Sequence, residues 1–439
     1  MRTLRLVAAL LCALGAVAPP GPARAAGPLA HREVLPSGMI LLIAERRAVP
    51  VVVVTVSVRA GSVLDPPGGR GLANLTASLL TRGTAKRTGP ELDRAIEFVG
   101  GTLEAEAGRD TVSVSLAVLR KDLDLGLDLL AEVLREPTFP EAELSRKARE
   151  IQAVLERAEE DPETLASRAL ADALYPGHPY GRPVAGTKES VGQLTREQVV
   201  AFHRAHYRPD AATVAVVGDV SREEARQGIV ARLGGWARPA GPLPAIAIAS
   251  TRPPAVSRAM TRDLTQETMM LGGPAVRQDQ PEYFPLLVAS QALGGGSSSR
   301  LYTRVREERG LAYSIGSRLS AARHGSSVIV SLQTRNDAVD ETVKLVREEL
   351  ARMGRAPLPA AELDVAKSYL IGSFPLRLGT TANVAGFLIG VEDNGLGLGY
   401  PDVFRERVAR VTAADVARVA ARYLDPSGLS SVVVSGKSD

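Results

Sequence analysis

The sequence has little cysteine, histidine and aromatic content: one cysteine, five histidines and 4% aromatic residues in 439 positions. The cysteine, Cys12, lies in an amino-terminal apolar run. A chain that loses this run has no cysteine, which excludes disulfides, thiolate nucleophiles and cysteine metal sites. No later segment approaches the roughly 20 apolar residues of a transmembrane helix, so we expect no membrane insertion.

The amino terminus has the order of a secretory signal peptide. Arg2 and Arg5 precede the apolar run Leu6–Val17, and the small-residue stretch Ala23–Ala25 follows. This pattern predicts a signal peptide over residues 1–25 with cleavage before Ala26. We therefore expect a secreted protein that is located in the periplasm.

The charge of the chain gives no support for an anionic partner. Lysine and arginine number 53 against 49 acidic residues, a net charge of +4. Three of the basic residues (Arg2, Arg5 and Arg24) lie in the predicted signal peptide, so the net charge of the remaining chain falls to +1. We expect no nucleic-acid binding.

Landmarks in the first half of the chain recur in the second. FPEAEL at Phe139–Leu144 matches LPAAEL at Leu358–Leu363, an offset of 219. LTREQVVAFHRAHYRP at Leu194–Pro209 matches VTAADVARVAARYLDP at Val411–Pro426, an offset of 217. The near-equal offsets indicate a duplication with small insertions and deletions.

Each half contains apolar or alternating runs that are followed by helical patterns. The runs at Val51–Ser62 and Thr111–Val118 in the first half match those at Thr268–Val276 and Ser326–Leu332 in the second. Alternation with period two predicts strands, and the longer patterns that follow predict helices. Each half is therefore predicted to have an α+β fold.

A proline-rich segment separates the two halves. Arg238–Pro254 contains five prolines, which discourage regular structure. We predict an amino-terminal lobe over residues 26–237, a linker over 238–254 and a carboxy-terminal lobe over 255–439. Two lobes with a space between them suit a ligand longer than a metabolite.

The first half resembles the insulinase/pitrilysin zinc peptidases around GRGLANLTASLLTRGT, Gly69–Thr84. In that family a helix here carries the zinc motif H-x-x-E-H. Asn74, Ala77 and Ser78 stand where the first histidine, the glutamate and the second histidine would be. Because an amide, a methyl group and a hydroxyl replace the ligands and the base, we expect no zinc or other cofactor in this chain.

The resemblance also implies a third zinc ligand, a glutamate about 75 residues further on. The corresponding position falls near Ala153 or Val154, and Glu150 and Glu156 are close enough to leave the register open. The resemblance further implies two homologous lobes, each a mainly antiparallel sheet with helices packed on it.

His203 and His206 are the only two histidines near each other, three residues apart on a predicted helix. They could share one face of that helix and bind a metal. No Asp or Glu lies between them or directly beside either one in the sequence, so the preferred interpretation is a structural or solvated pair.

The second half resembles the other signature of the family in LGGGSSSRLYTRVREERGLAYSIGS, Leu293–Ser317. Arg306 and Tyr313 have the spacing of the family's second-lobe pair, which would donate hydrogen bonds to an oxyanion or a peptide carbonyl. The alternative is that Arg306 belongs to a solvated charge run and Tyr313 to the core face of a strand.

These observations predict a non-catalytic subunit that is inactive alone. In short bacterial members of the family one chain carries the zinc motif and its partner carries the Arg and Tyr pair. We expect a heterodimer in which Arg306 and Tyr313 act in trans beside a zinc-bearing homologous subunit, on peptides or unfolded proteins. The alternative is a peptide-binding or scaffold protein with no role in turnover.

Overall fold

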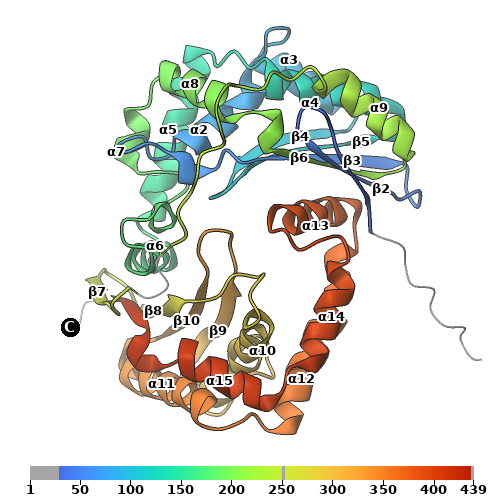
Figure 1. The fold of residues 1–439 in the computed structure, drawn as a ribbon. Helices are drawn as coiled ribbons and strands as arrows, with labels where there is room; N and C mark the ends of the chain where they lie inside the picture. Colours follow the sequence, from blue (N-terminus) through green and yellow to red (C-terminus); the bar gives the residue numbers. More distant parts are fainter. Residues whose placement is uncertain (1–28, 250–252, 437–439) are drawn as a thin grey trace, which may run out of the picture.

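The structure is a computed structural model that describes residues 29–249 and 253–436. The predicted signal peptide, residues 1–25, lies outside the described residues, as do residues 250–252 of the predicted linker. Two lobes face each other, the first coloured blue to green and the second yellow to red (Figure 1). No helix in the described ranges is long and apolar enough to cross a bilayer.

The first lobe is built on a six-stranded sheet. In spatial order its strands are β1 (His31–Val34), β2 (Ile40–Glu45), β6 (Ala212–Gly218), β3 (Val51–Val58), β5 (Val112–Leu119) and β4 (Thr102–Ala107). Neighbours are antiparallel except β2 and β6, which are parallel. The central strands β3 and β6 are buried along nearly their whole length, whereas β5 alternates between buried and half-buried residues. Side chains therefore cover both faces of the sheet at β3 and β6 but leave one face of β5 partly open.

Eight helices in the described residues belong to the first half. They are α2 (Leu72–Leu79), α3 (Gly89–Phe98), α4 (Leu123–Arg135), α5 (Glu141–Ala158), α6 (Pro162–Leu174), α7 (Lys188–Gly192), α8 (Arg196–His206) and α9 (Arg222–Leu233). Most of them lie on the outer face of the sheet (Figure 1). Their apolar sides form one core with the strands.

The second lobe has a five-stranded sheet in the described part of the chain. Its spatial order is β7 (Ser257–Thr261), β11 (Ser430–Ser435), β8 (Gln266–Pro274), β10 (Ser327–Arg335) and β9 (Ala312–Ser320). Its helices are α10 (Tyr283–Gly294), α11 (Val339–Arg355), α12 (Ala360–Ser373), α13 (Thr381–Asp393), α14 (Tyr400–Arg410) and α15 (Ala413–Tyr423). A π-helical segment, η6 (Tyr302–Glu307), precedes β9.

The two sheets have the same topology. The order β2-β6-β3-β5-β4 in the first lobe corresponds to β7-β11-β8-β10-β9 in the second. Among the described residues each sheet has one parallel pair, and it occupies the same place in both. The capping boxes correspond as well: Thr195 with Gln198 begins α8, and Thr412 with Asp415 begins α15. The predicted α+β fold with two homologous lobes is confirmed.

Each half contributes one helix to the inner face of the other half's sheet. Helix α13 packs on β3 and β6 of the first lobe, where Leu388 and Val384 join a buried cluster with Val53 and Val217. Helix α6 packs on β8 and β11 of the second lobe through a cluster that includes Leu170. Figure 1 shows both helices between the sheets. This reciprocal packing buries apolar surface of both lobes in shared clusters.

Candidate functional site

Helix α2, which carries the degenerate zinc motif, is held at its start by Asp65. The Asp65 carboxylate accepts hydrogen bonds of 2.8 Å from the backbone N–H groups of Gly71 and Ala73. Gly71 has φ of 90°, a left-handed conformation that glycine adopts without steric cost. Burial raises the pKa of Asp65 to about 6, although the two backbone bonds favour its charged form. Asp65 and Gly71 together determine where α2 begins.

The three motif positions offer no metal ligands. Asn74 and Ser78 lie one turn apart and are half-buried, and Ala77 is 1% exposed. The Ser78 hydroxyl donates a hydrogen bond of 2.8 Å to the Asn74 carbonyl oxygen of the same helix. A neutral amide, a methyl group and an engaged hydroxyl do not fit zinc. Over residues 29–249 and 253–436, no group of three His, Cys, Asp or Glu side chains is placed to hold a metal ion.

The third-ligand position lies on α5, which contacts α2. Ala153 and Val154 are exposed there, and Val154 has 56% of its surface accessible. The nearby glutamates have other partners: Glu150 pairs with Lys147 at 2.8 Å and Glu156 pairs with Lys188 at 2.8 Å. Both carboxylates form surface ion pairs, so neither compensates for the missing ligands on α2.

His203 has a packing role in the first lobe. One ring nitrogen, Nε2, lies 3.0 Å from the Leu134 carbonyl oxygen, and the ring packs edge-on against Phe139. Burial lowers the pKa of His203 to about 4, which keeps the ring neutral at neutral pH. The neighbouring His206 packs against Phe202 instead. These contacts favour the structural interpretation of the histidine pair.

Arg306 and Tyr313 are close together in the second lobe. Arg306 lies in η6 and Tyr313 near the start of β9, and both are exposed. The guanidinium carbon of Arg306 lies 5.6 Å from the centre of the Tyr313 ring and 5.1 Å from that of Tyr302. These are cation–π distances, so two aromatic rings position the guanidinium. Tyr302 was not predicted as part of this site, although its separation of four residues from Arg306 places it about one helical turn away.

A β-bulge determines the direction of the Tyr313 side chain. In the β9–β10 ladder Ser314 pairs with Gln333 and Ala312 pairs with Thr334, which leaves Tyr313 as the extra residue. A bulge of this kind redirects a side chain relative to strict alternation. Tyr313 is 73% exposed, so the alternative that it lies on the core face of a strand is wrong.

An open cleft lies on the inner face of the second sheet. Its volume is about 680 Å³, and it is lined by α6, by strands β8, β9 and β10, by the end of α10 and by Tyr369 of α12. Small residues, Gly294, Gly295 and Gly316, form part of the wall. Because glycine has no side chain, this wall leaves room for an extended peptide backbone beside edge strand β9.

Comparison with known proteins identifies the family. The sequence model described as Insulinase (Peptidase family M16) matches residues 41–188, and the one described as Peptidase M16 inactive domain matches residues 193–370. An uncharacterized zinc protease of Mycobacterium leprae is 32% identical over 368 residues, which cover 81% of this chain and 80% of that protein. The chain belongs to peptidase family M16, the insulinase family.

Solved structures share the fold. A peptidase M16 inactive domain from Pseudomonas fluorescens has a TM-score of 0.87 at 28% identity, covering 93% of this chain and 98% of that chain. A protease from Helicobacter pylori has a TM-score of 0.84 at 21% identity, covering 93% and 99%, which shows the fold alone. The predicted family is therefore confirmed. The likeness to an inactive domain is consistent with a non-catalytic M16 protein, as the residues of α2 indicate.

Proposed function

We propose that this M16 chain is the non-catalytic subunit of a heterodimeric peptidase. It binds a peptide substrate and supplies Arg306 and Tyr313 to the site of a homologous, zinc-bearing partner. The observation that carries the proposal is the contrast between the lobes: α2 offers no metal donors, whereas the bulge in β9 presents Tyr313 to the surface beside Arg306. We propose further that residues 1–25 direct the chain to the periplasm.

The chemistry of the pair supports this role. Attack on a peptide carbonyl creates an oxyanion, which hydrogen-bond donors stabilise. Arg306 has a permanent charge and Tyr313 a neutral hydroxyl donor. Tyr313 is 73% exposed, and its ring packs against the Arg306 guanidinium rather than in a core. Its hydroxyl is therefore accessible to a substrate held by a second subunit.

Co-expression with a homologous M16 chain that contains H-x-x-E-H tests the proposal. We expect peptide hydrolysis from the pair and none from this chain alone. Tyr313→Phe and Arg306→Ala should each reduce turnover of the pair by about 10²- to 10³-fold, the usual effect of removing one oxyanion donor. Arg309→Ala is the matched control, because this neighbouring arginine is exposed and pairs with Glu341 at 3.0 Å.

A peptide-binding scaffold is the second candidate, favoured by the open cleft on the inner face of the second sheet. The same experiment separates the two functions. If both variants turn over substrate as fast as the wild-type pair while the chain still binds peptide, the role in trans is refuted and the scaffold is favoured.

A further inference from the structure

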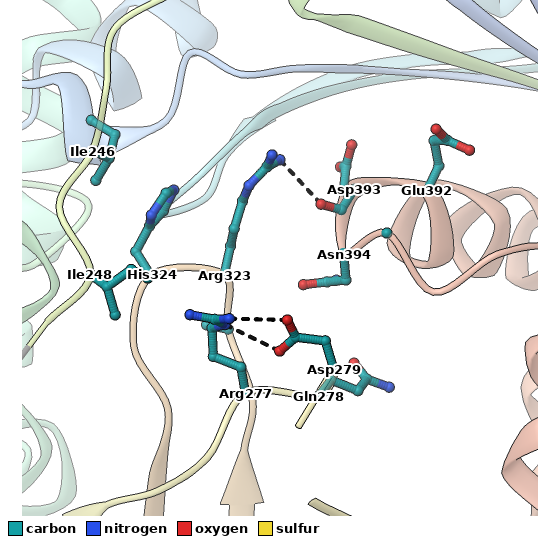
Figure 2. Close-up of a pocket in the computed structure, with 12 residues that line it drawn as sticks. Ile246, Ile248, Arg277, Gln278, Asp279, Arg323, His324, Glu392, Asp393 and Asn394 are labelled. Atoms are coloured by element: carbon teal, nitrogen blue, oxygen red, sulfur yellow. Dashed lines mark hydrogen bonds and ion pairs between the residues drawn. The ribbon is translucent and has the colours of Figure 1, made fainter. Parts of the chain in front are cut away.

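A second cavity, of about 420 Å³, lies between the lobes at the far end of β9 from Tyr313. Three segments surround it: Arg277–Asp279 after β8, Ala322–His324 between β9 and β10, and Glu392–Gly395 at the end of α13 (Figure 2). The length of the nine-residue strand β9 separates it from the Arg306 pair by on the order of 25 Å. It is a different site from the one proposed above.

Arg323 lines the cavity, and its guanidinium interacts electrostatically with the Asp393 carboxylate without forming a direct ion pair in the described residues. Arg323 donates a hydrogen bond of 3.1 Å to the Asp393 carbonyl oxygen and forms no ion pair within residues 29–249 and 253–436. The guanidinium of Arg59, a first-lobe residue near Arg323, donates a hydrogen bond of 3.1 Å to the Asp210 carbonyl oxygen. Burial and the charge of Arg323 lower the pKa of Arg59. Two positive charges thus lie close together, and the Asp393 and Asp210 carboxylates compensate them in part.

The carboxylates around the cavity already have donors. Asp279 accepts two bonds of 3.0 and 3.1 Å from the arginine two residues before it, and Glu392 accepts two bonds of 2.9 Å from Arg32. Asp393 accepts a bond of 2.8 Å from the Ser57 hydroxyl, and burial raises its pKa. These contacts engage the three carboxylates of the lining, whereas the Arg323 guanidinium, which donates one hydrogen bond, has N–H donors left for an anion.

One wall of the cavity is apolar. Ile246 is half-buried and Ile248 has 56% of its surface accessible, and both come from the segment that joins the lobes. Figure 2 shows them on the side of His324 and Arg323. A ligand with an anionic group next to an apolar side chain would contact both the guanidinium and this apolar wall.

We propose that this cavity binds the free carboxyl terminus of a peptide, with the carboxylate on Arg323 and the last, apolar side chain against Ile246 and Ile248. A guanidinium matches a carboxylate through two parallel N–H donors, which gives such a contact geometric specificity. The volume accommodates about two residues of a chain that continues into the space between the lobes. The choice of a peptide as ligand rests on the proposed function, but the site requires no turnover.

Calorimetric titration of the chain alone tests the site. The probes are an acetylated hexapeptide that ends in a free leucine carboxylate, its carboxamide, and a carboxamide with an internal glutamate. We expect the free acid to bind at least tenfold tighter than either amide. Arg323→Gln should abolish this preference, and Asp393→Asn should strengthen it because a negative charge leaves the cavity.

Arg335→Gln is the matched control, because Arg335 ends strand β10 and pairs with Asp337 at 3.0 Å away from the cavity. It should keep the wild-type preference. Equal binding of acid and amide by the wild type would overturn the proposal, as would a preference that survives Arg323→Gln. Tight binding of the internal-glutamate amide, or displacement of the peptide by equimolar acetate, would also overturn the assignment to a peptide terminus. If the titration shows no preference for the free acid, the proposed role of Tyr313 in turnover is still tested separately by Tyr313→Phe in the co-expressed pair.

Discussion

Three substitutions should create a zinc site on the helix that now lacks one. The variant combines Asn74→His, Ser78→His and Val154→Glu. Positions 74 and 78 lie one turn apart on α2, and position 154 lies on α5, which contacts α2. Two imidazoles and one carboxylate form a ligand set that zinc accepts, with a fourth position left for water.

The expected change in the free energy of unfolding follows from the contacts that Ser78 and Val154 make in the wild-type chain. Replacing Ser78 removes one hydrogen bond within the helix, about 1 kcal/mol. Val154 is 56% exposed, so its replacement loses less than about 1 kcal/mol of burial. Zinc at 100 times its dissociation constant should then stabilise the variant by about 2.7 kcal/mol relative to the metal-free protein.

The assay is urea unfolding with zinc and with a chelator. The double variant Asn74→His and Ser78→His is the control, and its smaller shift should show the contribution of position 154. Hydrolysis is not expected, because the general base is still absent at Ala77, which is 1% exposed. A triple variant that folds but shows no zinc-dependent shift would refute the placement of these positions. A shift of equal size in the wild type would refute the conclusion that Asn74, Ala77 and Ser78 do not fit zinc.

Two further predictions concern stability. Leu388→Ala on α13 and Leu170→Ala on α6 replace side chains that are 0% and 1% exposed, and each should lower the free energy of unfolding in urea by about 2–5 kcal/mol. Leu376→Ala, at a leucine that is 74% exposed, should change it by less than about 0.5 kcal/mol; equal losses in all three would contradict the proposed packing between lobes. Because the pKa of His203 is about 4 in the folded chain and about 6.5 in the unfolded one, stability should fall as the pH falls from 6.5 to 4, by up to about 3 kcal/mol. His203→Gln should flatten that fall, and an unchanged pH profile would contradict the burial of the ring.

The strands and helices of this chain were predictable because their patterns are local. The valine-rich run at Val51–Val58 and the alternation at Val112–Leu119 form β3 and β5 as expected. Strand β3 is buried along nearly its whole length and β5 alternates because of packing between distant elements, which the sequence pattern does not reveal. Helix α13, more than 250 residues further along the chain, packs mainly on β3 and β6, and of β5 only Ala117 belongs to the edge of this cluster in the described residues.

The candidate site was predictable to a different extent in each lobe. Asn74, Ala77 and Ser78 lie within one helix, so their separation and their chemistry follow from the helical repeat. The exposure of Tyr313 was not predictable, since alternation along β9 also allowed a core position. The bulge opposite Gln333 and Thr334 decides it, and bulges depend on pairing between strands.

The sequence by itself determined the repeated α+β architecture, the family and the lack of metal donors on α2. Each of these depends on residue type and on spacing within a short segment. Only the tertiary structure decided which helix crosses to which sheet, where Tyr313 points, and that Arg59 and Arg323 come close together. Those features depend on contacts between residues hundreds of positions apart, which are set by the packing of whole elements.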